Sequence, residues 1–333
     1  MQAYTFRQAT LADRPAIIQF MNTHWGEKHP IINLPDFFDY YYLADDNTLR
    51  FALAEADGKL AALAGFVPAS QALKPDIWVS IWVADKKQSG AGLELMAALP
   101  TLTGSGTLAC NNIRPKTRPF YEFLGYTTGR VGHFYRLANR TTYVVAHIAH
   151  KHILPVSGVA TLQPLPTVQA LQASGFTPPQ NHNPYKDFWY LARRYYAYPR
   201  QQYNVLGGYL PGQATPAALL VTRTVPVQGT HALRIVDYIG EADFLPQLGS
   251  AIDALIAGQN AEYADLYCAG IPAKTLQEAG FCERTEDDAN IIPNYLTPLL
   301  QKNIEYYYFT NNPQNFTMFR ADGDQDRPNI PVP

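Results

Sequence analysis

The segment IWVSIWVADKKQSGAGLELMAAL, residues 77–99, joins an alternating apolar run to a glycine-bearing loop and then to an apolar helix. Within 77–83 the isoleucines and valines fall on one face and the tryptophans and Ser80 on the other, which is the period of a β-strand. Backbone N–H groups at the start of a helix attract anions, and glycines let a phosphate approach the backbone closely. The segment therefore predicts a strand, a phosphate-binding loop and a helix over 93–99, although an ordinary turn before a helix has the same pattern.

The residues around this segment predict further strands and helices. Asp57-Gly58 is a strong signal for a tight hairpin between two apolar runs. The expected strands are 4–7, 51–56, 60–67, 77–83, 107–110 and 126–137, and the expected helices are one that follows Asp13 and then 35–42, 93–99 and 117–124. This order predicts an α/β (α+β) unit, in which helices flank a mixed sheet.

The chain contains a degenerate internal repeat. Ala9-Thr10-Leu11 recurs as Ala160-Thr161-Leu162, and Asp36-Phe37-Phe38 recurs as Asp187-Phe188-Trp189, both at an offset of 151. The offset then grows to about 156, which places 77–83 opposite 233–239. We therefore expect four parts along the chain: a first copy at 1–138, a linker or crossing strand at 139–155, a second copy at 156–310 and an acidic C-terminal tail at 311–333.

The second copy lacks the glycine loop. After its alternating strand, Glu241 and Asp243 stand where phosphates would need donors, and Pro246 has no N–H group. We expect this copy to keep the fold, to have lost phosphate binding and to complete an acceptor cleft.

Composition narrows the class of protein. The chain has 333 residues, with 26 Lys and Arg against 28 Asp and Glu, so its net charge of −2 disfavours a nucleic-acid partner. No apolar run approaches the ~18 residues of a membrane span, and the first residues do not resemble a signal peptide. The three cysteines are far apart, which fits free thiols in a reducing cytoplasm. No Cys/His cluster has zinc-ligand spacing, so no metal is expected.

Three motifs carry a resemblance to a known family. They are Arg7-Gln8-Ala9-Thr10 with Asp13, Lys87-x-x-Gly90-x-Gly92, and Phe120-Tyr121-x-x-x-Gly125-Tyr126. With the order of elements, they resemble the GNAT superfamily of acyl-CoA N-acyltransferases, although that family's loop usually opens with Gln or Arg where Lys87 stands here. The resemblance implies two tandem GNAT-like domains, each a mixed, mostly antiparallel sheet flanked by helices, with acetyl-CoA or another acyl-CoA as cosubstrate.

The resemblance also implies roles for particular residues. Tyr121 would protonate the leaving thiolate, although a half-buried helix tyrosine would look the same. Either His29 or Glu27 could take a proton from an attacking amine, because histidine titrates near neutral pH, although a solvated loop is an equal possibility. The expected cofactor-binding residues are Trp82, Val83, Lys87, Gln88, Ser89, Gly90, Ala91, Gly92 and Asn112. The expected substrate-binding residues are His24, Trp25, Asp322, Asp324, Asp326 and Arg327.

The tail and several aromatic segments resemble those of tandem GNAT proteins in bacterial surface-polysaccharide pathways. The predicted function is therefore N-acylation, most simply N-acetylation, of a nucleotide-linked amino sugar as small-molecule acceptor. Three alternatives stay open: another acceptor such as a peptide or polyamine, an aminoacyl-tRNA-dependent transfer as in Fem-type proteins, and a degenerate, non-catalytic binding protein. The sequence leaves the oligomeric state open.

Overall fold

The computed structural model describes residues 3–44, 46–285 and 287–332. The first copy contains β1 (Thr5–Thr10), α1 (Arg14–His24), α2 (Pro30–Asn33), α3 (Pro35–Tyr42), β2 (Thr48–Ala56), β3 (Lys59–Pro68), β4 (Ile77–Ala84), α4 (Ala91–Thr103), β5 (Leu108–Ile113), α5 (Arg118–Phe123) and β6 (Thr127–Leu137). The second copy contains β7 (Thr161–Pro164), α6 (Val168–Ala173), α7 (Phe188–Tyr195), β8 (Asn204–Tyr209), β9 (Ala218–Val227), β10 (Thr230–Ile239), α8 (Gly249–Gly258), β11 (Ala261–Ala269), α9 (Ala273–Glu278) and β12 (Cys282–Arg284). The remaining strands are β13 (Tyr295–Leu296), β14 (Leu299–Leu300), β15 (Tyr306–Thr310) and β16 (Met318–Phe319).

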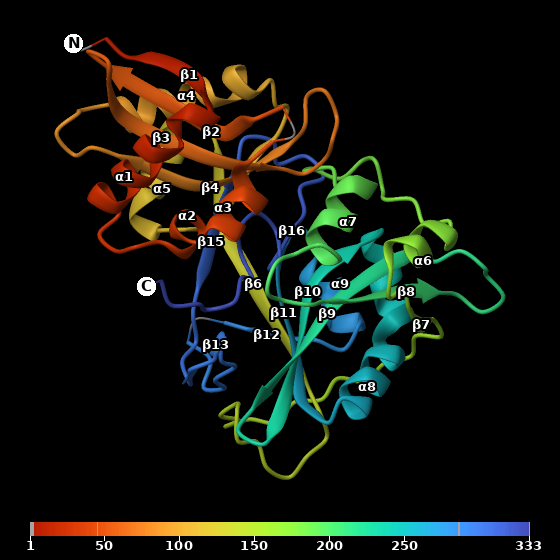
Figure 1. Ribbon diagram of the computed structural model, residues 1–333. Coiled ribbons are helices and arrows are strands. Elements are labelled where there is room, and N and C mark those ends of the chain that lie inside the picture. The colour runs from red at the N-terminus through yellow and green to blue at the C-terminus, as the bar shows by residue number, and fades with distance from the viewer. Residues whose placement is uncertain (1–2, 45, 286, 333) are drawn as a thin grey trace.

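One long sheet runs through both copies (Figure 1), in the order β1-β2-β3-β4-β5-β15-β6-β11-β10-β9-β8-β7. The pairs β4–β5 and β10–β11 are parallel, and the other neighbours on this path are antiparallel. The predicted hairpin at Asp57-Gly58 joins β2 to β3, and both residues have positive φ, as a tight turn of this kind requires. The expected fold class, a mixed and mostly antiparallel sheet flanked by helices, is confirmed.

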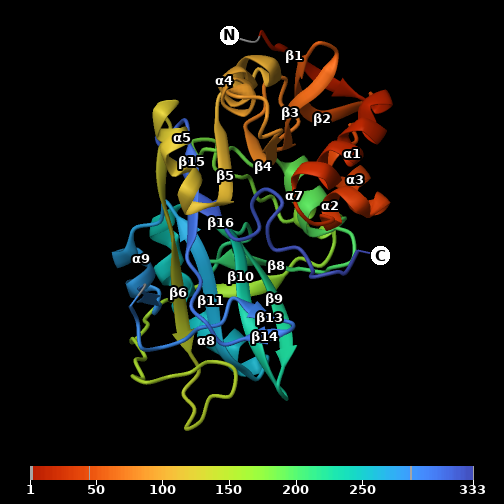
Figure 2. The ribbon, with the colours of Figure 1, turned by 90° about the vertical axis from the view of Figure 1, so that its left-hand side faces the viewer.

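Each half of the sheet takes one strand from the other copy. β15 lies between β5 and β6 and pairs antiparallel with both. In turn, residues 132–137 of β6 pair with β11, and residues 133–135 pair with β12. Figure 2 shows β6 and β15 together at the passage between the two halves. The pairing therefore crosses the boundaries expected at 138 and 310, because the strand at 306–310 completes the first copy's half of the sheet.

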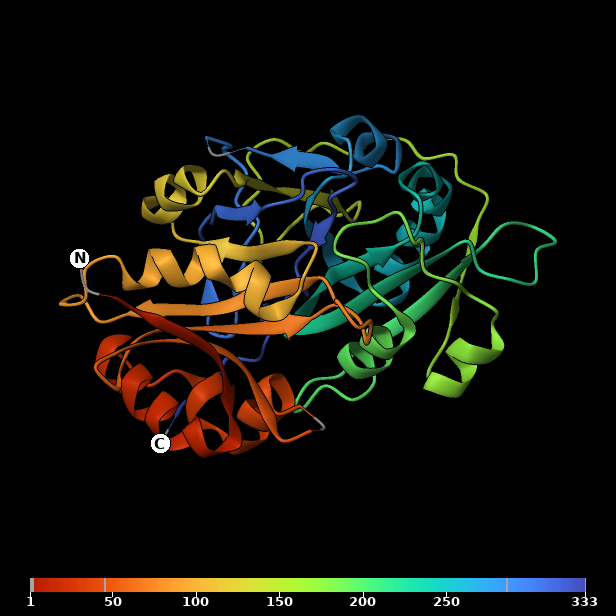
Figure 3. The same ribbon diagram turned by 90° about the horizontal axis from the view of Figure 1, so that it is seen from above.

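Helices cover both faces of each half-sheet (Figure 3), and their apolar sides form the cores. In the first copy α4 packs on one face, while α1, α2 and α3 pack on the other. In the second copy α8 and α9 cover one face, and α6 and α7 the other. Cys110, Cys268 and Cys282 are free thiols. No helix within the described ranges is long and apolar enough to cross a membrane.

The internal repeat is visible in the backbone as well as in the sequence. In β4 the register skips Ser80, so that Ile81 lies opposite Gly65 while Val79 lies opposite Phe66. In β10 the register skips Val236 in the same way. Residues 80 and 236 are separated by the offset of about 156 that the sequence comparison gave. A bulge re-aims the strand and breaks its pairing, so this conserved geometry marks the equivalent place in both copies.

The strands that follow the bulges open away from their parallel neighbours. β4 pairs with β5 only at Ile77 and Trp78, and β10 pairs with β11 as far as Ile235. In the second copy the tail fills this opening, because β16 pairs with β11 and the Ala321 N–H donates to the Val236 carbonyl at 2.9 Å. No strand among the described residues fills the opening between β4 and β5 in this manner. The first copy therefore keeps an accessible opening that the second copy has closed.

Candidate active site

A cavity of about 1140 Å³ lies at the opening between β4 and β5 and extends to the second copy. From the first copy its lining includes His24, Trp25, Glu27, His29, Ser80, Trp82, Val83, Lys86, Cys110, Asn111, Asn112, Arg114 and Tyr121. From the second copy it includes Gln201, Arg223, Arg234, Asn294, Glu305 and Tyr306, and from the tail Arg320, Asp324, Gln325, Asp326 and Arg327. The fold thus brings both copies and the tail to one cavity.

β4 presents a free backbone edge to this cavity. Its pairing with β5 ends at Trp78, so residues 79–84 have no strand partner on that side within the described chain. Ser80 is held by a 2.9 Å hydrogen bond between its hydroxyl and that of Tyr42. Unpaired N–H groups on a fixed strand are the kind of donor that can hold a carbonyl oxygen.

The glycine loop lies beside the cavity, and only its first residue, Lys86, belongs to the lining. Gly90 caps the start of α4 with φ +87°, a conformation that side chains rarely adopt. Gly92 is buried because the Trp82 indole packs on it and donates a 3.0 Å hydrogen bond to its carbonyl. Trp82, Val83 and Asn112 line the cavity, whereas Lys87, Gln88, Ser89, Gly90, Ala91 and Gly92 do not. Phosphate binding by this loop stays a prediction.

Tyr121 faces the cavity from α5 and is 4% exposed. Its ring stacks on Phe309 of β15, with centroids 4.1 Å apart, and lies 5.5 Å from the Trp82 ring. Burial raises the pKa of Tyr121, so the phenol stays protonated and can act as a hydrogen-bond donor. The strand that comes from the other copy therefore fixes the position of this residue.

His29 is buried at the cavity wall and differs from expectation. Its Nε2 lies 3.3 Å from Nη2 of Arg327, which can only donate, so Nε2 accepts. Burial, and then the charge of Arg327, lowers the pKa of His29 to about 3. The expectation that His29 titrates near neutral pH and serves as a base must therefore be corrected, because its lone pair is engaged and its charged form is disfavoured.

The other candidate residues at the end of α1 and between α1 and α2 lie around the same part of the cavity as His29. The Trp25 ring contacts the guanidinium of Arg114 at 5.6 Å, and it meets His29 edge-on. The His24 Nδ1 atom is 3.9 Å from an Asp85 carboxylate oxygen. Glu27 is exposed and lines the cavity. Of the two base candidates, Glu27 is therefore the one with a free approach to a ligand.

The tail is largely buried over 318–326, and ion pairs fix this stretch. Asp324 accepts from Arg327 at 3.0 Å, and both residues line the cavity. Asp326 also lines it, and its carboxylate binds Arg223 at 2.7 Å and Arg320 at 3.1 Å. The two arginines hold the pKa of Asp326 well below its usual range. These contacts make the tail part of the wall of the cavity.

Asp322 has a different environment from the other tail residues. It is fully buried, accepts from Lys186 at 2.7 Å and from the Phe319 N–H at 2.7 Å, and is not in the lining. Lys186 also binds Asp237. The expected substrate contact of Asp322 is therefore replaced by a structural role, because its carboxylate anchors the tail to the second copy.

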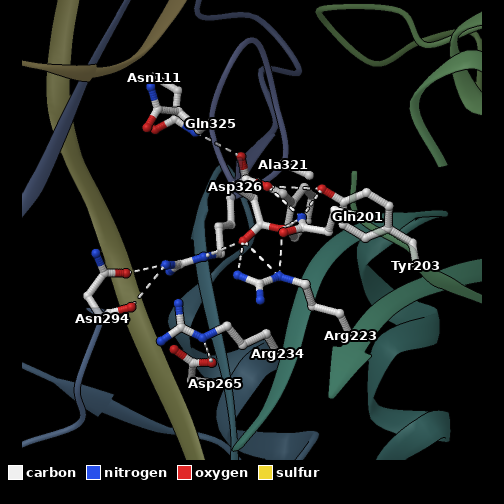
Figure 4. A network of polar contacts seen from close by, with 12 residues as sticks. Asn111, Gln201, Tyr203, Arg223, Arg234, Asp265, Asn294, Ala321, Gln325 and Asp326 are labelled. Atoms are coloured by element: carbon white, nitrogen blue, oxygen red, sulfur yellow. Dashed lines mark hydrogen bonds and ion pairs between the residues drawn. The ribbon is translucent and has the colours of Figure 1, made fainter. Parts of the chain in front are cut away.

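Sequence reasoning missed the polar cluster on the second-copy wall, shown in Figure 4. It comprises Arg223, Arg234 and Arg320 together with Asp326 and Asp265. The available signal was a charge inside an apolar strand: Arg234 interrupts the alternating run of β10. Strand arginines on a buried sheet are unusual unless they are paired or face a ligand.

No protein-family model matches the chain, and no curated protein matches it in sequence. Among solved structures it is similar to a GCN5-related N-acetyltransferase from Anabaena variabilis ATCC 29413 (TM-score 0.53, 11% identity, covering 92% of this chain and 72% of that one). It is also similar to a conserved Enterococcus faecalis V583 protein described as a probable N-acyltransferase (TM-score 0.56, 11% identity, covering 92% and 72%).

This chain has the fold of the GCN5-related N-acetyltransferases. The likeness spans 92% of the chain, so it extends over parts of both copies. Within this fold the chain has the two β-bulges, the opening after β4 and the tyrosine on α5 described above.

Proposed function

We propose that the chain is an acyl-CoA-dependent N-acyltransferase with one CoA site, in its first copy. The observation that carries this proposal is the unfilled opening between β4 and β5, which leads into the cavity beside Tyr121. The matching opening in the second copy holds the tail. A thioester in the first opening would lie along the free edge of β4.

The reaction follows from the residues around the opening. The nitrogen of a neutral amine attacks the thioester carbonyl carbon, and the C–S bond breaks as the amide bond forms. N–H groups of Trp82–Ala84 would hold the carbonyl oxygen while negative charge develops on it. Tyr121 would donate to the departing thiolate, and the proton lost by the amine would pass to water or to Glu27. His29 would hold Arg327 in place and remain neutral.

For the acceptor we propose a nucleotide-linked amino sugar, with acetyl-CoA as donor. Support comes from the cavity volume of about 1140 Å³, which exceeds what a single small amine fills. The lining joins aromatic faces such as Trp25 and Tyr306 to amide and arginine side chains such as Asn294 and Arg223. Aromatic faces suit sugar rings, and amides and guanidiniums suit hydroxyl and phosphate oxygens.

The experiment has a binding part and a product part. Calorimetry with acetyl-CoA should show one binding site per chain. The Gly90→Val substitution should abolish acetyl-CoA binding, because the backbone at residue 90 has a positive φ that valine rarely adopts. Mass spectrometry of reactions with acetyl-CoA and a panel of amines should show acylation of nucleotide-linked amino sugars. Two equivalent CoA sites, or unchanged affinity in a folded Gly90→Val protein, would contradict the first-copy site. CoA binding with no acylated product from any amine would favour a non-catalytic protein.

A further inference from the structure

Two arginines lie directly opposite each other on the second-copy wall of the cavity. In the antiparallel pair β9–β10, Arg223 is the cross-strand neighbour of Arg234, and in the parallel pair β10–β11, Arg234 is the neighbour of Asp265. Like charges placed directly opposite are destabilising in a sheet. Arg320 of the tail joins them through Asp326, so three guanidiniums share two carboxylates. The cluster keeps an excess of positive charge.

Two donors of this cluster have no hydrogen-bond partner within the described chain. Arg234 is 1% exposed, and its Nη2 donates to the Pro293 carbonyl at 2.7 Å. Its Nε lies 3.6 Å from Oδ1 of Asp265, which is too long for a hydrogen bond and leaves that oxygen unpaired as well. This Nε and the Nη1 of Arg320 are buried and make no hydrogen bond within the described chain. Burial, and then the charge of Arg320, lowers the pKa of Arg234. A buried donor without a partner is costly, so the arrangement points to a ligand that supplies the missing acceptors.

The charge of the cavity as a whole is consistent with a ligand that supplies anionic acceptors. Its lining holds six basic side chains, Lys86, Arg114, Arg223, Arg234, Arg320 and Arg327, against four acidic ones, Glu27, Glu305, Asp324 and Asp326. The chain itself has a net charge of −2. Positive charge is therefore concentrated in the cavity, where it attracts anionic ligands.

We infer that Arg223, Arg234 and Arg320 form a subsite for a phosphate group carried by the acceptor. This inference rests on the proposed acyl transfer and names the residues that would bind the phosphates of its nucleotide-linked acceptor. Guanidinium groups bind phosphate oxygens by paired N–H donors, which a neutral amine cannot use. In this subsite Arg223 and Arg234 lie on β9 and β10 of the second copy (Figure 4), and Arg320 follows β16 in the tail. This position separates it from the glycine loop at the start of α4, which is the expected place for the phosphates of CoA.

The test uses the full chain and inorganic pyrophosphate as the probe. Calorimetry at constant ionic strength should show pyrophosphate binding to the wild type, and Arg234→Met should weaken it about 10- to 100-fold, as loss of a charged hydrogen-bond donor does. Acetyl-CoA affinity should be unchanged. Arg136→Met is the matched control: Arg136 is equally buried, but it binds Asp253 outside the cavity. If Arg234→Met does not fold, Arg223→Gln serves in its place, because Arg320 still partners Asp326.

Each outcome bears on the subsite separately from the acyl transfer. Absence of pyrophosphate binding, equal weakening in Arg136→Met, or competition between pyrophosphate and CoA would overturn the inference. Binding that depends on Arg234 but with no acylated product would retain the subsite and reject the transferase. With an active enzyme, Arg234→Met should raise KM for a phosphorylated amino sugar at least tenfold while KM for its dephosphorylated form stays the same. An increase for both forms alike would overturn it.

Discussion

The buried imidazole of His29 predicts a pH dependence of folding stability. The pKa of His29 is lowered from 6.5 to about 3 in the folded chain, so the unfolded chain binds more protons between these values. Stability therefore rises with pH across this window, and it is lost as the pH falls below 6.5. Each pH unit within the window corresponds to about 1.4 kcal/mol. At pH 4.5, two units below the unfolded pKa, His29 should cost about 3 kcal/mol.

His29→Gln isolates this contribution. The glutamine oxygen can accept from Arg327 as the His29 Nε2 atom does, but it takes up no proton. Urea unfolding at pH 7.5 and pH 4.5 should show that the wild type loses about 3 kcal/mol more than the variant over this interval. Other titrating groups act in both proteins and cancel in the difference.

Nuclear magnetic resonance provides an independent measurement on the folded protein. The ring signals of His29 should remain those of a neutral imidazole down to about pH 4, since the folded pKa is about 3. A midpoint near 6.5, or an equal loss of stability in both proteins, would refute the burial argument. The same reasoning predicts that His29→Gln leaves the shape of the pH–rate profile unchanged, as expected if His29 positions Arg327 and transfers no proton.

Three further predictions concern other parts of the molecule. Tyr121→Phe should lower kcat roughly 100-fold without changing CoA affinity; normal turnover would leave Tyr121 as packing for Phe309. Residues 1–138 expressed alone should show no cooperative unfolding by circular dichroism, because β15 is missing from their sheet; a sharp transition would contradict this. Deleting the chain from Ala321 onward should lower Tm, because Asp322 and Asp326 both make buried ion pairs. Breaking such a pair costs about 3–5 kcal/mol. An unchanged Tm would show that these pairs contribute nothing to stability.

Local pattern predicted the individual elements of the first copy well. The alternation over 77–83 is the observed β4, and the helix expected over 35–42 is α3. Both predictions depend on the period of the apolar residues and on nearby turn residues, and these signals lie within a few positions of one another in the sequence. The repeat offset of about 156 also separates the two bulged residues, Ser80 and Val236, although the sequence pattern did not predict the bulges themselves.

Long-range pairing could not be predicted in this way. The run of four aromatic residues in β15 would look the same whether the strand paired within its own copy or with β5 and β6. The structural role of Asp322 in the tail could not be predicted, because the sequence does not show that Lys186, from a distant segment, binds its carboxylate. His29 was misjudged for the same reason: its pKa depends on burial and on Arg327, almost three hundred residues away.

The second copy makes two structural contributions to the cavity. It supplies β15, whose Phe309 holds Tyr121 against the cavity, and it carries the arginines that form the opposite wall. The tail that closes its own opening is the segment that delivers Asp324, Asp326 and Arg327 to that cavity. Because β15 and the tail reach the cavity through pairing with strands of both copies, the cavity needs both copies to be complete. A fused repeat, rather than two separate chains, keeps both halves at equal concentration and in one register.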